Sequence, residues 1–165
     1  MPGDRVRAKA KGNFTVSYHY MECGLDNVTV EGIQSRDDGA DATVTIRNVN
    51  GLHRAIAEAI VAHKAGISGK ELRFLRTEMG MTQAELAKIV HHDTQSIGRW
   101  ERGEFPIEPN ADALIRLLAV ERLKLTADVD GVESLSGRCV PTATPQQIVI
   151  DGRDPARYRP LELAA

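Results

Sequence analysis

The chain has 165 residues, which suffices for one or two small domains with modest hydrophobic cores. Hydrophobic residues account for 42% of the chain and charged residues for 27%, which excludes a wholly disordered protein. The formal net charge is -2, so nucleic-acid binding would have to depend on a local basic patch.

Residues 1–13 are basic, small and aperiodic, and we expect them to form a flexible N-terminal arm. An alternative is that the basic side chains of this arm contact nucleic-acid phosphates. The arm contains no apolar signal segment, and no apolar run in the chain is long enough to span a bilayer. We therefore expect a cytoplasmic protein that does not bind membranes.

The sequence predicts an α+β protein whose first domain, residues 14–66, contains a small antiparallel β-sheet and one helix. Three runs show the alternation of apolar and β-branched residues that is typical of strands, around residues 15–20, 28–33 and 43–46. Asp38-Gly39 lies between the last two runs and predicts a hairpin turn. The apolar residues of segment 51–64 recur at helical spacing, so this helix is expected to cover the sheet.

An all-α domain is predicted for residues 67–125. Ser68 with Glu71, and Thr82 with Glu85, have the spacing of capping boxes, so a helix is expected to begin at each pair. A further helix is expected to follow the acidic, proline-containing loop EFPIEPN.

A short helix over residues 93–102 is the element on which the functional interpretation depends. Asp93 is a suitable N-cap, and Gly103 is suited to end the helix. Ile97 and Trp100 are three residues apart and are expected to anchor the helix to the core, leaving polar side chains outside. Two short helices joined by a tight turn, with polar groups exposed on the second, form the arrangement of a helix-turn-helix motif.

Residues 126–165 are rich in turn residues and prolines and have little periodicity, so we predict an irregular tail with Cys139 as an exposed thiol. The alternative for the short apolar run at residues 148–150 is a strand added to a sheet edge, in this chain or in another.

The segments TQAELA and SIGRWERG resemble the Cro/C1 (XRE-type) helix-turn-helix domain, and the similarity extends from about residue 72 to residue 118. Relatives usually have Gly-Val in the corner between the two helices, where this chain has His91-His92. Because the glycine position requires a positive φ, we expect His91 to adopt one. The resemblance also implies a structural ion pair between Arg76 and Glu101 that joins the first helix of the domain to the third.

The segments YHYMECGLDNVTVEGI and IRNVNGLHRAIA resemble the N-terminal part of MqsA-like (YgiT-type) regulators and antitoxins, over about residues 18–62. These proteins join a small, often zinc-binding domain to an XRE-type helix-turn-helix. The zinc-binding relatives use paired CxxC motifs, whereas this chain has no CxxC and only Cys23 at a comparable place. We therefore expect no metal.

The outward residues of helix 93–102 suit the recognition of DNA bases. Gln95 can pair with adenine and Arg99 with guanine, and Thr94 is a short donor that can also reach a base edge. Contacts to DNA phosphates are expected from the residue that matches the family's phosphate-binding glutamine, from a short hydroxyl and from four basic side chains: Gln83, Ser96, Lys70, Arg73, Lys88 and Arg102.

These features predict a sequence-specific transcriptional regulator, a nucleoid-associated (auto)repressor that binds a double-stranded operator as a homodimer. The alternative is a type II antitoxin that also neutralises a toxin protein through its N-terminal domain or its tail. The five histidines have no partner at metal-ligand spacing, and no phosphate loop or nucleophile motif occurs. We therefore expect no catalytic residue and no cofactor, and hence not an enzyme.

Overall fold

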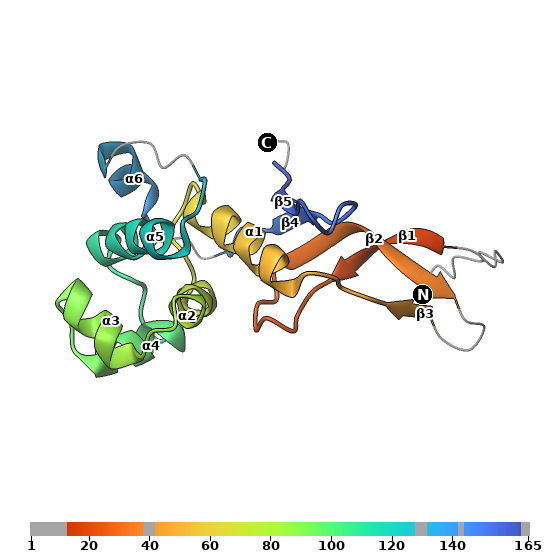
Figure 1. Ribbon diagram of the computed structural model, residues 1–165. Coiled ribbons are helices and arrows are strands. Elements are labelled where there is room, and N and C mark those ends of the chain that lie inside the picture. Colours follow the sequence, from red (N-terminus) through yellow and green to blue (C-terminus); the bar gives the residue numbers. More distant parts are fainter. Residues whose placement is uncertain (1–12, 38–41, 128–131, 142–143, 163–165) are drawn as a thin grey trace, which may run out of the picture.

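The computed structural model describes residues 13–37, 42–127, 132–141 and 144–162 (Figure 1). The predicted α+β class is confirmed, with a sheet at one end of the molecule and a group of helices at the other. Residues 1–12 of the predicted N-terminal arm and the Asp38-Gly39 turn lie outside the described residues, whereas Asn13, the last residue assigned to the arm, begins β1. The strands are β1 Asn13–His19, β2 Val28–Asp37, β3 Ala42–Val44, β4 Ile148–Asp151 and β5 Arg159–Pro160. The helices are α1 Val49–Val61, α2 Gly69–Glu78, α3 Gln83–Val90, α4 Thr94–Glu101, α5 Pro109–Leu123 and α6 Val132–Arg138.

The sheet is mixed rather than purely antiparallel. β2 pairs with β1 and β3 in the antiparallel sense, but its other neighbour, β4, runs parallel to it with Val30 opposite Ile150. β5 then pairs antiparallel with β4. The alternation in the first strand is confirmed, because Val16 and Tyr18 are half-buried while Thr15, Ser17 and His19 are exposed.

The prediction of an irregular tail is wrong for α6, β4 and β5, because these parts of residues 126–165 are regular and packed against the rest of the chain. The alternative prediction is confirmed for residues 148–150: they form a strand at the edge of β2, in the sheet of the same chain. Ile148 and Ile150 belong to the main hydrophobic core, which explains why the strand is ordered. A run of three apolar residues is too short to reveal this from its own pattern.

The thiol of Cys139 is buried, contrary to the prediction of an exposed one. α6 packs against α5, and this contact places Cys139 in a small cluster with Ala113 and Leu135. The thiol donates a hydrogen bond to the Leu135 carbonyl at 3.1 Å. Burial raises the pKa of the Cys139 thiol to about 11, so this group stays protonated at neutral pH.

Helix α1 lies between the sheet and the remaining helices. Its residues Leu52, Ile56 and Ile60 are fully buried, as the helical spacing predicts. The buried side chains form one continuous cluster from the sheet through α1 into the helical half. The division into two domains at residues 66 and 67 stays a prediction, since hydrophobic packing is continuous across it.

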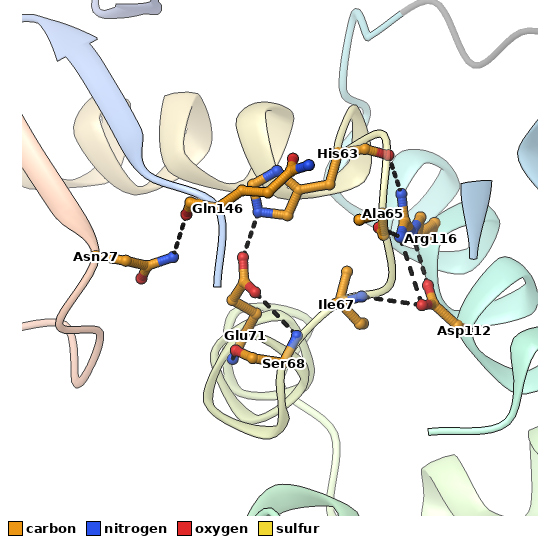
Figure 2. A network of polar contacts seen from close by, with 9 residues as sticks. All are labelled: Asn27, His63, Ala65, Ile67, Ser68, Glu71, Asp112, Arg116 and Gln146. Carbon is orange, nitrogen blue, oxygen red and sulfur yellow. Dashed lines mark hydrogen bonds and ion pairs between the residues drawn. The ribbon is translucent and has the colours of Figure 1, made fainter. Parts of the chain in front are cut away.

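A buried polar network links the segment after α1 to α2 and α5 (Figure 2). The Arg116 side chain, with no exposed surface, pairs with Asp112 at 2.7 Å and donates to the carbonyls of His63 and Ala65. Asp112 also accepts the backbone N–H of Ile67 at 3.0 Å. The buried Arg116 guanidinium is thus neutralised by one carboxylate and satisfied by backbone oxygens.

The same network includes a buried contact between the His63 ring and the Glu71 carboxylate. Burial alone would raise the pKa of Glu71, but the hydrogen bonds from the His63 ring and the Ser68 backbone hold it below its usual value. Glu71, the glutamate of the predicted capping box at the start of α2, therefore also fixes the segment after α1 to α2.

Among the described residues, no helix is both long and apolar enough to cross a membrane.

The role of β4 in the core can be tested by substitution within that strand. Ile150→Ala removes a fully buried side chain and is expected to lower the free energy of unfolding by about 2–5 kcal/mol. Val149→Ala changes a half-buried neighbour and is expected to have a clearly smaller effect. Urea denaturation of both variants makes the comparison. Equally small losses would show that β4 does not contribute to the folded core.

Candidate nucleic-acid interface

Each of the two short helices α3 and α4 begins with a side-chain cap. Thr82 accepts the backbone N–H of Glu85 at 3.1 Å while Glu85 accepts that of Thr82 at 2.7 Å, which confirms the capping box. Asp93 accepts the backbone N–H of Ser96 at 2.7 Å, and this bond holds the pKa of the Asp93 carboxyl below its usual value. These caps fix where the two helices begin.

The corner between α3 and α4 uses both histidines. His91 has a φ of 58°, as expected for the residue in the glycine position, and its backbone N–H donates to Ala87. The ring of His92 packs edge-on against Trp100 with 4.7 Å between ring centroids. The unusual His-His pair therefore closes the turn and helps to hold the second helix.

The carboxylate of Glu101 joins α2, α3 and α4. Arg76 on α2 donates to it through Nε at 2.5 Å and through Nη2 at 3.1 Å. Gln83 at the start of α3 donates its amide at 2.8 Å. The Glu101 side chain is only 5% exposed, so these charge-assisted bonds act in a largely desolvated site.

α4 presents a polar face to solvent. Ile97 and Trp100 are buried against α2 and α3, as their spacing predicts. Thr94, Gln95 and Arg99 are exposed on the opposite face. In Figure 1 α4 lies at the end of the molecule far from the sheet, so the N-terminal half does not cover this face.

Comparison with known proteins agrees with this geometry. Residues 72–124 match the family model described as helix-turn-helix. This segment is similar to helix-turn-helix domains. The match supports a DNA-binding regulator of the Cro/C1 type, and the resemblance of residues 18–62 to MqsA-like proteins stays a prediction. No curated protein and no solved structure matches the chain.

Two of the residues predicted to contact phosphates, Gln83 at the start of α3 and Arg102 at the end of α4, lie beside Gly98. A Cβ atom at Gly98 would lie 3.0 Å from Nη1 of Arg102 and 3.7 Å from Oε1 of Gln83. Both side chains thus cover the same glycine on α4. The Arg102 guanidinium also pairs with the exposed Glu104 at 2.6 Å, a surface contact that contributes little to stability.

The remaining phosphate candidates are spread over the domain. Ser96 is half-buried and donates its hydroxyl to Asp93, and Arg73 is exposed on α2. Lys70 pairs at 2.7 Å with Asp26 in the turn between β1 and β2, and both side chains are more than half exposed. Lys88 lies on the side of α3 that faces α5, where it lines a hollow with Arg122. The structure therefore does not place Lys88 beside the other candidates.

Two features of the domain were missed by the sequence analysis. Phe105 is 55% exposed, and the Arg99 guanidinium lies 5.9 Å from the centroid of its ring, within the range of a cation–π contact. The signal available in the sequence was a phenylalanine in the acidic loop that follows α4. At Gly69, a Cβ would lie 2.1 Å from the carbonyl oxygen of Trp100, so only glycine lets the start of α2 approach the end of α4 this closely.

The Arg76–Glu101 ion pair is expected to stabilise the helix-turn-helix domain. Arg76→Ala leaves the Glu101 carboxylate without its charged partner, so the free energy of unfolding should fall by about 2–4 kcal/mol. Arg73→Ala removes an exposed arginine from the same helix and is the matched control, with an expected change below about 0.5 kcal/mol. Chemical denaturation measures both. If the two variants unfolded alike, the ion pair would not support the domain.

Proposed function

We propose that the protein is a sequence-specific transcriptional regulator that reads the major groove of double-stranded DNA with α4. One observation carries this proposal: inside the matched helix-turn-helix segment, Thr94, Gln95 and Arg99 are exposed on a helix that Ile97 and Trp100 anchor from behind. A rigid helix with its polar face outward suits entry into a major groove.

The exposed groups of α4 match the donors and acceptors of base edges. The Gln95 amide can pair bidentately with N6 and N7 of adenine, and the Arg99 guanidinium with O6 and N7 of guanine. Phe105 beside Arg99 limits the orientations of the guanidinium, which lowers the entropy lost when Arg99 binds. Thr94 at the start of α4 is a third donor for a base edge.

Contacts to the DNA backbone are proposed for two groups of residues around α4. Gln83, Ser96 and Arg102 lie on α3, on α4 and at the end of α4, where they can flank an inserted helix. Lys70 and Arg73 on α2, and Lys88 on α3, contribute positive charge at a greater distance. The surface pairs of Lys70 and Arg102 do not prevent such contacts, because exposed ion pairs are weak and exchange readily.

A single helix reads only a few base pairs, so we propose a homodimer on a pseudo-palindromic operator, with half-sites about one helical turn apart. Repression, including repression of the protein's own gene, would follow from occupancy of such an operator. The alternative is an antitoxin that binds a toxin through its N-terminal domain or its tail. Binding through the tail has less support, because residues 148–151 of the tail already pair within the protein's own sheet.

The proposal is tested by selecting bound sequences from a random duplex library with the full chain. Arg99→Ala is expected to weaken binding to the selected operator by about 1–3 kcal/mol and to relax the preference at one base position. Arg102→Ala should weaken all duplexes to a similar extent and reduce the salt dependence of binding.

Arg157→Ala is the control, since Arg157 is an exposed arginine in the loop between β4 and β5 and should leave both properties unchanged. A wild-type protein that selects no preferred sequence, or an Arg99→Ala variant with the wild-type preference, would contradict the proposal.

A further inference from the structure

A basic cavity lies in the sheet half of the protein, between β3 and the loop that follows β4. Its volume is about 380 Å³, which is within the range of small-molecule sites. Three arginines contribute to its lining, Arg36, Arg47 and Arg153, and the described lining residues include no carboxylate. Figure 1 shows β3 and α4 at opposite ends of the molecule, so the cavity is separate from the proposed DNA-reading surface.

The cavity exists because β2 changes its partner along its length. Residues 28–31 of β2 pair with β4, whereas residues 35–37 pair with β3. Gly32, between the two regions, has a φ of 75°, and a Cβ there would lie 2.4 Å from Cγ of Arg153. The glycine therefore lets the strand diverge and leaves room for the Arg153 side chain across it.

Hydrogen bonds between distant parts of the sequence fix the walls of the cavity. The Tyr158 hydroxyl donates to the Arg47 carbonyl at 2.6 Å, and the Asn48 amide donates to the Pro155 carbonyl at 2.9 Å. These bonds hold the loop after β4 against the segment after β3. The cavity is thus formed by two segments far apart in the sequence, residues 33–47 and 152–158, and is defined before any ligand binds.

The ion pairs of the lining arginines decide how much net positive charge the cavity carries. Arg153 makes a bidentate ion pair with Asp151, and these bonds hold the pKa of the Asp151 carboxyl well below its usual range. That pair is electrically neutral, so Arg153 adds no net charge, whereas Arg47 adds one positive charge to the lining. Within the part of the chain that the structure describes, the exposed Arg47 side chain has no ion pair.

We propose that this cavity binds a small, hydroxyl-rich molecule that carries a phosphate group, in the class of the sugar phosphates. Guanidinium groups bind phosphate oxygens in bidentate geometry and keep their charge at any physiological pH. The Gln34 amide and the hydroxyls of Thr43 and Thr45 also line the cavity and match the hydroxyl groups of a sugar. The size of the cavity favours a small phosphorylated molecule over a DNA duplex.

Isothermal titration calorimetry on the full chain tests the inference with four probes: a hexose 6-phosphate, the free hexose, inorganic phosphate and a short random DNA duplex. The hexose phosphate is expected to bind, the free hexose not at all, and inorganic phosphate more weakly because it leaves the hydroxyl and amide groups unpaired. Arg47→Gln should weaken binding of the hexose phosphate by about tenfold or more through loss of a charge-assisted contact. Arg122→Gln, an exposed arginine on α5 outside the cavity, should have no effect.

Amide chemical shifts of Thr43 and Thr45 in the wild-type protein provide a second measurement, which does not depend on the folding of a variant. They should move on addition of the hexose phosphate. The inference is overturned if no phosphate-bearing probe binds, or if the two arginine variants lose binding equally. It is also overturned if Arg47→Gln weakens binding of the duplex but not of the hexose phosphate, because the cavity would then be a DNA contact. None of these outcomes depends on whether α4 reads an operator.

Discussion

The bonds that converge on the Glu101 carboxylate determine how α4 is held against α2 and α3. Arg76 and Gln83 approach the same carboxylate from α2 and α3, so the three helices are joined at one largely buried point. None of these bonds uses a side chain on the opposite face of α4. α4 itself is therefore held in a defined orientation relative to α2 and α3, which a DNA-reading helix requires.

A second set of buried polar contacts connects the helix-turn-helix domain to the rest of the chain. Arg116 and Asp112 on α5 fix the segment after α1, and the contact between His63 and Glu71 fixes the same segment to α2 (Figure 2). Asn27 in turn donates to the Gln146 carbonyl at 2.7 Å, just before β4. Buried polar groups thus link the sheet, the tail and the helical half, and leaving any of these groups without its partner would cost free energy.

Local signals in the sequence predicted the helical half well. Capping pairs, the cap at Asp93 and the spacing of Ile97 and Trp100 each depend on residues close together in the chain, and the structure contains all of them. The positive φ at His91 followed from its place in a known pattern.

Long-range contacts account for what the sequence did not reveal. The pairing of β4 with β2 joins residues more than a hundred positions apart, and the burial of Cys139 depends on α6 lying against α5. The i,i+4 pair of Asp112 and Arg116 has the appearance of an exposed helical ion pair, yet both residues are buried. The cavity beside Gly32 likewise forms only when residues 33–47 and 152–158 meet.

Methylation protection by dimethyl sulfate tests the central claim most directly, because the reagent attacks N7 of guanine in the major groove and N3 of adenine in the minor groove. If α4 inserts into the major groove with Arg99 on a guanine, the bound wild-type protein protects guanine N7 atoms in two half-sites about one helical turn apart. Protection limited to adenine N3 atoms, or no protection on a duplex that the protein binds, would contradict the account.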